Sequence, residues 1–97
     1  MKFSELDFKP HPKLSGIQAK HFFNNGYGVS ILKSPHSYGG FEGLYELAIL
    51  KEYIQRGYGS DIQKSWRIYE NSPIADDFLG NLTEEQVESI VTYVVNL

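Results

Sequence analysis

Cysteine is absent from this 97-residue chain. Its absence excludes disulfides, thiolate zinc sites and cysteine nucleophiles. The sequence also lacks an apolar run of about 20 residues, the length of a membrane-spanning helix, and its first residues are too polar for a signal peptide. We therefore expect a cytoplasmic protein with no membrane partner, and the length predicts a single domain, 1–97.

The chain also has fewer basic than acidic residues. The formal net charge of −3 argues against a dedicated duplex-binding protein, which normally carries a clustered basic face. The charge is also too small for a mimic of nucleic acid. The chain is instead rich in aromatic residues (14%, including seven Tyr), which serve either in cores or at interfaces.

The chain is organised around a β-hairpin predicted over residues 17–33, in which apolar residues alternate on both sides of a turn at 24–26. A two-residue loop would mix a lysine into the apolar face. A three-residue loop, with Gly26 in the left-handed conformation, instead pairs Ala19 with Ile31 and keeps that face apolar. We therefore predict the three-residue loop, because a one-residue slip would turn the whole apolar set to water.

The remaining segments complete the expected fold. We predict an extended arm or a short edge strand over 1–16 and a sheet within 17–70 with long loops at 34–43 and 52–64. Within and after this sheet we predict strands at 44–51 and 65–70, a crossover at 74–80 and a helix over 83–96. Segment 44–51 fits a helix by composition and a strand by alternation, and we interpret it as a strand. The result is an α+β fold, with a three- to four-stranded antiparallel sheet and one C-terminal helix packed on one face.

Two local patterns make finer predictions. Thr83 followed by Gln86 three residues later is typical of a capping box, so the helix should begin there. In the strand at 65–70, alternation predicts that Trp66 and Ile68 point into the core. Arg67 and Tyr69 would then point outward.

The residue types that carry chemistry form no recognisable catalytic or metal-binding motif. His21 falls on the core face of the hairpin, whereas His11 and His36 lie in proline-containing loops. Asp76 and Asp77 are adjacent and therefore diverge rather than share one ion. The glycine-rich stretches match neither a P-loop nor a dinucleotide fingerprint. We expect a protein that is not an enzyme and that holds no metal or cofactor.

Two features favour a binding function. Tyr and Arg are enriched at interface hot spots, and they occur with Phe in the predicted loops. The predicted outer face of the sheet is too apolar to be fully solvated, because it would carry Phe22, Leu32, Leu50 and Tyr69. The arm, a second copy of the chain or a foreign partner should therefore cover it. The candidate partner-binding residues are Phe22, Leu32, Tyr38, Phe41, Arg56, Tyr58, Arg67 and Tyr69.

Three stretches, GIQAKHFFNNGYGVSIL, GLYELAIL and SPIADDFLGNLTEEQV, resemble a group of small uncharacterised proteins encoded by bacteriophages and prophages. The likeness covers most of residues 8–97, and this chain departs from the group by a longer insertion at 52–64. The resemblance implies a phage origin, a sheet topology and a location in the cytoplasm of the bacterial host. It transfers no site residue.

Small accessory phage proteins often act by occupying a host or defence protein. Our leading hypothesis is therefore a non-enzymatic binding protein that inhibits a bacterial defence complex, in the manner of anti-CRISPR proteins. The alternative is a self-assembling structural or accessory module that uses the outer sheet face or an exposed edge strand. A third and weaker hypothesis is an enzyme that acts on a small phosphorylated or nucleotide ligand through His36 and the glycine-rich loops.

Overall fold

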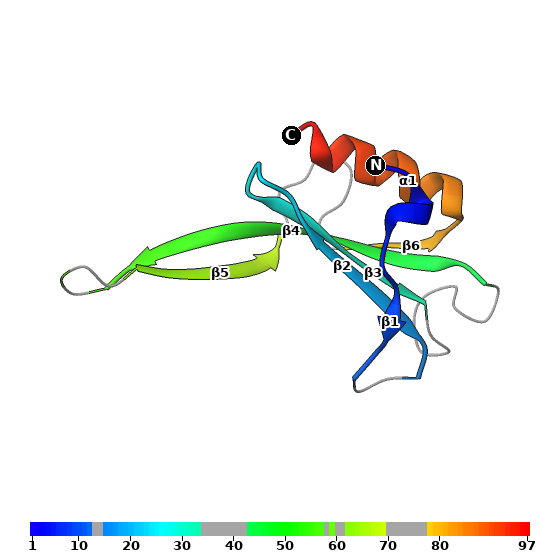
Figure 1. Cartoon of the computed structure of the whole chain (residues 1–97), viewed down its shortest axis with the longest axis horizontal. Coiled ribbons are helices and arrows are strands. Elements are labelled where there is room, and N and C mark those ends of the chain that lie inside the picture. Colours follow the sequence, from blue (N-terminus) through cyan, green and yellow to red (C-terminus); the bar gives the residue numbers. More distant parts are fainter. Residues whose placement is uncertain (13–14, 34–42, 58, 60–61, 70–77) are drawn as a thin grey trace.

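A computed structural model describes residues 1–12, 15–33, 43–57, 59, 62–69 and 78–97. Its elements are a short 3-10 helix η1 (Phe3–Glu5), strands β1 (Lys9–Pro10), β2 (Ile17–Phe22), β3 (Tyr27–Lys33), β4 (Tyr45–Arg56), β5 (Ile62–Ile68) and β6 (Phe78–Leu82), and helix α1 (Glu84–Val95). The strands form one antiparallel sheet in the order β1-β2-β3-β4-β5, and β6 pairs with β4. Helix α1 lies across one face of this sheet (Figure 1).

The α+β class and the C-terminal helix agree with the prediction, but the sheet is larger than the three or four strands expected. The additional strands are β1, which has only two residues, and β6, which overlaps the crossover predicted at 74–80. Asn81 in β6 has a positive φ of 57°, and the pairing with β4 shifts register nearby. Such a bulge breaks the alternation by which a strand is recognised in a sequence.

The register of the β2–β3 hairpin confirms the predicted three-residue loop. Ala19 lies opposite Ile31, and the Phe23 N–H donates to the Tyr27 carbonyl at 2.8 Å. Gly26 has a φ of 83°, which glycine adopts without steric cost. This register defines two faces of the sheet: the helix face, which carries Ala19 and Ile31 and packs against α1, and the open face on the other side.

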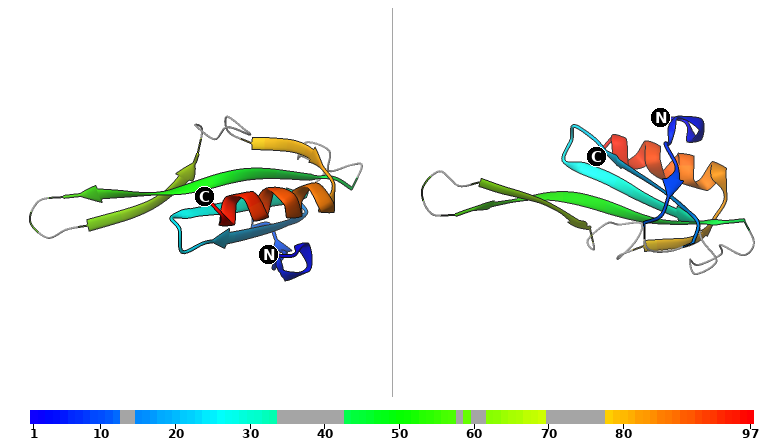
Figure 2. Two further views of the ribbon diagram at one scale, coloured as in Figure 1. Left: turned by 90° about the horizontal axis from the view of Figure 1, so that it is seen from above. Right: turned by 60° about the horizontal axis from the view of Figure 1, so that its bottom comes forward.

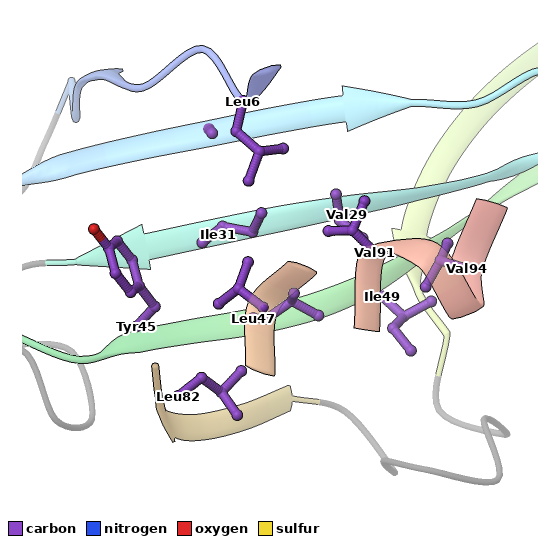
Figure 3. Close-up of a cluster of buried hydrophobic side chains, with 11 residues drawn as sticks. Leu6, Val29, Ile31, Tyr45, Leu47, Ile49, Leu82, Val91 and Val94 are labelled. Carbon is purple, nitrogen blue, oxygen red and sulfur yellow. The ribbon is translucent and has the colours of Figure 1, made fainter. Parts of the chain in front are cut away.

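The hydrophobic core lies between the helix face and α1 (Figure 3). Val87, Val91 and Val94 of α1 are fully or almost fully buried, as are Leu47 and Ile49 of β4. The valines recur at i, i+4 and i+7, which places them on one side of the helix. Thr83 caps the helix start and exchanges backbone–side-chain hydrogen bonds with Gln86 at 2.9 and 3.2 Å, so the predicted capping box is confirmed.

The N-terminal arm packs on the helix side of the molecule. The rings of Phe3 and Phe8 lie 5.3 and 5.6 Å from the ring of Tyr45, and the Phe3 N–H donates to a carboxylate oxygen of Glu88 at 3.1 Å. Leu6 is buried in the same cluster. These aromatic and aliphatic side chains of the arm therefore extend the core and leave the open face to other contacts.

Strand β4 confirms the strand predicted at 44–51, but it continues to Arg56, and β5 begins at Ile62. The long loop predicted over 52–64 is therefore wrong. The glycines at 57 and 59 belong to a short connection between the two strands. The residues on both sides of that connection include Tyr, Ile and Trp, which favour extended backbone.

The second half of β4 and most of β5 project from the body as a two-stranded ribbon (Figures 1 and 2). Pairing between β3 and β4 ends at Lys51, so beyond this residue β4 pairs only with β5. The radius of gyration is 14.4 Å, against about 12.5 Å for a compact chain of this length. We call residues 51–57 and 62–68 the ribbon.

Candidate interaction surfaces of the ribbon

The two faces of the ribbon follow from the pairing of β4 with β5. Lys51 lies opposite Arg67, and Ile54 lies opposite Lys64. Because side chains alternate along a strand, odd-numbered residues continue the helix face beyond Ile49 and even-numbered residues continue the open face. Helix α1 does not extend over the ribbon (Figure 2), so among the described elements no helix covers either of its faces.

The open face carries most of the exposed large hydrophobic side chains in the part of the chain that the structure describes. Phe22, Ile54, Ile62 and Ile68 are 43–60% exposed, and the other two such residues lie at the C-terminus. Trp66 is half-buried on the same face, with its ring 4.5 Å from that of Phe22. We call these five residues the apolar stripe.

A glycine in the central strand allows the two aromatic rings of the stripe to meet. Gly28 is directly opposite Phe22. A Cβ atom at Gly28 would lie 2.7 Å from the His21 carbonyl oxygen and 3.1 Å from the Phe22 ring. The first distance is too short for the backbone to stay in place, and the second is tight enough that the ring would also have to move slightly. Gly28 therefore provides the space that Phe22 occupies beside Trp66.

Three tyrosines and two cations meet on the helix face, at the point where the ribbon joins the body. The Lys51 ammonium lies 5.7, 5.9 and 5.2 Å from the ring centroids of Tyr27, Tyr53 and Tyr69. The Arg67 guanidinium lies 5.5 Å from the Tyr53 centroid. Tyr27 and Tyr69 meet edge to face at 5.4 Å. We call these five residues the tyrosine–cation cluster.

The charges of the chain are unevenly distributed. Residues 51–68 contain four basic and two acidic residues, including both arginines of the chain. The rest of the chain contains five basic and ten acidic residues, so the net charges are +2 and −5. The ribbon is therefore a basic projection from an acidic body, which the overall charge of −3 conceals.

The structure corrects the orientation predicted for β5. Tyr69 packs against the core cluster and Arg67 lies on the helix face, whereas Trp66 and Ile68 lie on the open face. The prediction placed the largest apolar side chains inward. That rule fails here because α1 ends before the ribbon, so β5 has little core to face.

The other candidate residues have separate positions. Phe22 and Leu32 lie on the open face, as predicted, and Leu32 is half-buried. Arg56 is exposed at the end of β4 and also belongs to the open face. Tyr38, Phe41 and Tyr58 lie outside the described residues.

Five ribbon residues of the two surfaces were not among the candidates predicted from the sequence: Lys51, Tyr53, Ile54, Ile62 and Trp66. A signal was present in the sequence. Two runs of alternating residues flank a short segment that contains both glycines, which is the pattern of a hairpin. The glycines were instead interpreted as part of one long loop.

Groups suited to catalysis are few in the described residues. His21 is half-buried, with its ring 4.9 Å from that of Phe23. No three His, Asp or Glu side chains in this part of the chain are grouped closely enough to hold a metal ion. Burial, and to a smaller degree the charge of Glu84, raises the pKa of the Tyr45 hydroxyl above its usual value. None of the described helices is long and apolar enough to cross a membrane.

Comparison with protein-family models found no match, and comparisons with curated proteins and with solved structures found no significant similarity.

Proposed function

We propose that this chain is a small, non-enzymatic, phage-type binding protein that holds a protein partner on the apolar stripe. The observation that carries the proposal is the concentration of exposed hydrophobic side chains on one face of a projecting ribbon. Exposed apolar side chains gathered among polar ones, here Glu52, Arg56 and Lys64 on the same face, are typical of interaction sites. Aromatic residues such as Trp66 and Phe22 are the types that anchor interfaces.

The ribbon form suits insertion into a groove of a larger protein. A two-stranded ribbon is only marginally stable in water by itself, and a partner that buries it would stabilise it. Burial of each half-exposed isoleucine of the stripe would contribute on the order of 1 kcal/mol. The outer edge of β5 has no paired strand among the described residues, so a partner strand would find free backbone groups there.

The specific form of the proposal is inhibition of a bacterial defence complex, in the manner of anti-CRISPR proteins. Its support is the resemblance to small phage-encoded proteins together with a binding surface that projects from the body. In this form the ribbon would occupy a site that the defence complex needs. The activity can be measured in bacteria whose defence system targets a given phage. Plaque formation by that phage is compared between cells that express this chain and cells that do not.

The test compares the wild-type chain with stripe and control variants. The stripe variant carries Ile54→Ser and Ile62→Ser, and the control carries Val95→Ser, an exposed hydrophobic residue at the far end of α1. We expect the wild type and the control to raise plaque formation and to retain the same lysate protein in affinity capture, and the stripe variant to do neither. Circular dichroism checks that all three chains are folded. Equal behaviour of the stripe variant and the wild type would contradict the proposal.

Self-association is a second candidate, favoured by the unpaired edge of β5. If two copies paired antiparallel about Ser65, Ile62 would lie opposite Ile68, and Lys64 would lie opposite Trp66. Apolar and cation–aromatic pairs of this kind stabilise neighbouring strands. Light scattering coupled to size exclusion tests this candidate: a dimer mass that Ile62→Ser reduces to the monomer supports it, and a monomer at every concentration rejects it.

A further inference from the structure

We propose that the helix face of the ribbon, centred on the tyrosine–cation cluster, binds single-stranded nucleic acid. This site is separate from the proposed protein-binding surface, because the two lie on opposite faces of the same ribbon. The proposal rests on three observations: the placement of the cations, the aromatic rings beside them and the polar side chains that continue this face toward the tip.

Lys51 and Arg67 are placed so that one anion could contact both of them. Lys51 and Arg67 are directly opposite each other on β4 and β5, where like charges repel. Neither forms an ion pair with another described residue, and Glu52, the acidic residue next to Lys51 in β4, points to the open face. A phosphate group bound between the two cations would relieve their repulsion.

The aromatic rings supply surfaces on which bases stack. Tyr53 is half-buried and lies in the part of β4 that pairs only with β5. Its ring is in contact with both cations, at 5.9 Å from Lys51 and 5.5 Å from Arg67. A base that stacks on Tyr53 would displace these flexible head groups toward its own phosphates, so stacking and charge neutralisation would occur together.

Toward the tip, the described side chains of this face are polar and uncharged. Gln55 lies opposite Gln63, and Ser65 lies opposite Tyr53. Amide side chains donate and accept hydrogen bonds, so they suit the edges of unpaired bases. From Lys51 to Gln55 this surface is about 13 Å long.

The arrangement favours a single strand over a duplex. In a duplex the base faces are stacked on one another, so Tyr53 would have no base to stack on. Duplex-binding proteins also commonly contact about six to ten phosphates, whereas this face offers two cations. The acidic body, with a net charge of −5, would repel a long rigid duplex that passed beside it.

Fluorescence anisotropy with a labelled oligothymidine or oligouridine of about 12 nucleotides tests the proposal. With two phosphate contacts, we expect binding to weaken about 25-fold between about 20 mM and about 200 mM salt. The variant with Lys51→Gln and Arg67→Gln should lose most of this salt dependence. Tyr53→Leu should weaken binding about 5- to 150-fold.

The matched control is Ile54→Ser, which changes the neighbouring residue on the opposite face and should leave oligonucleotide affinity unchanged. Any of three results with oligonucleotides would overturn the proposal: no binding at about 100 µM protein in low salt, equal affinity for a duplex of the same length, or an unchanged affinity in Tyr53→Leu. Displacement of the oligonucleotide by polyglutamate at equal charge would also overturn it, since it would indicate a site for acidic peptides. Because the stripe variants test the other face, failure of either proposal is distinguishable from failure of the other.

Discussion

The side-chain amide of Asn25 donates a hydrogen bond to the main-chain carbonyl of Val94 at 2.9 Å, which joins the hairpin turn to the last turn of α1. The same amide donates to the Val95 carbonyl at 3.1 Å, and its oxygen accepts from the Tyr27 N–H at 3.1 Å. The last carbonyls of a helix have no partner within the helix. A turn residue distant in sequence therefore caps the C-terminal end of α1.

We expect Asn25→Ala to lower the free energy of unfolding by about 1–2 kcal/mol, because the helix carbonyls and the turn lose their shared partner. Urea denaturation followed by circular dichroism measures the change. Asn24→Ala, at the neighbouring exposed turn position, is the control and should cost much less. If the two variants were equally stable, the capping contact would contribute nothing to stability.

Substitution of Gly28 by Ala should lower stability by about 1–3 kcal/mol, because the new methyl group must displace either the His21 carbonyl or the Phe22 ring. Trp66 is the only tryptophan in the chain, so its fluorescence reports on the contact with Phe22. We expect Gly28→Ala and Phe22→Ala to shift the emission in the same direction. Unchanged emission in Gly28→Ala would mean that the ring keeps its position beside Trp66.

The capping box at the start of α1 gives a third prediction. Thr83→Ala should cost about 0.5–2 kcal/mol, since the Gln86 N–H loses its acceptor. The control is Thr92→Ala in the last turn of the helix, where the hydroxyl donates to the Glu88 carbonyl and Ala has the higher helix propensity. Chemical denaturation compares the two variants, and an equal loss in both would show that the cap is dispensable.

The raised pKa of Tyr45 predicts a loss of stability in alkali. The folded state keeps the phenol proton to a higher pH than the unfolded chain does, so it binds more protons between the two pKa values. The stabilisation is complete below the unfolded pKa of about 10 and is lost as the pH rises through the folded pKa. Urea unfolding at about pH 9 and about pH 11 should show the decrease. Tyr45→Phe should reduce it, and an identical decrease in that variant would assign the effect to other tyrosines.

The parts of the fold that depend on neighbours in sequence were predictable. Gly26 fixes the hairpin register through local turn geometry, and Thr83 with Gln86 fixes the helix start. The extension of β4 past Lys51 was missed because two glycines close together indicated a loop, although the residues around them favour strand. Strand β6 was missed because the bulge near Asn81 removes its alternation.

The candidate surfaces depend on contacts between distant segments, and the sequence predicted less of them. Alternation along β4 is enough to place Tyr53 on the same face as Ile49. It does not show that Lys51 pairs with Arg67, because that pairing can be deduced only if the length of the β4–β5 connection is known. Nor does it show that α1 ends before the ribbon, which decides whether Trp66 or Arg67 faces the core. Residue types and alternation alone therefore placed Phe22 on the correct face, but they put Arg56 in a loop and Arg67 and Tyr69 on the wrong face.

One uninterrupted strand, β4, links the core to the ribbon. The first part of β4 carries Leu47 and Ile49, which are buried in the core, and the same strand continues without a break into the ribbon. A partner that binds the ribbon therefore also restrains the part of β4 that lies in the core. Occupancy at the tip should slow amide hydrogen exchange deep in the core, where that partner makes no contact.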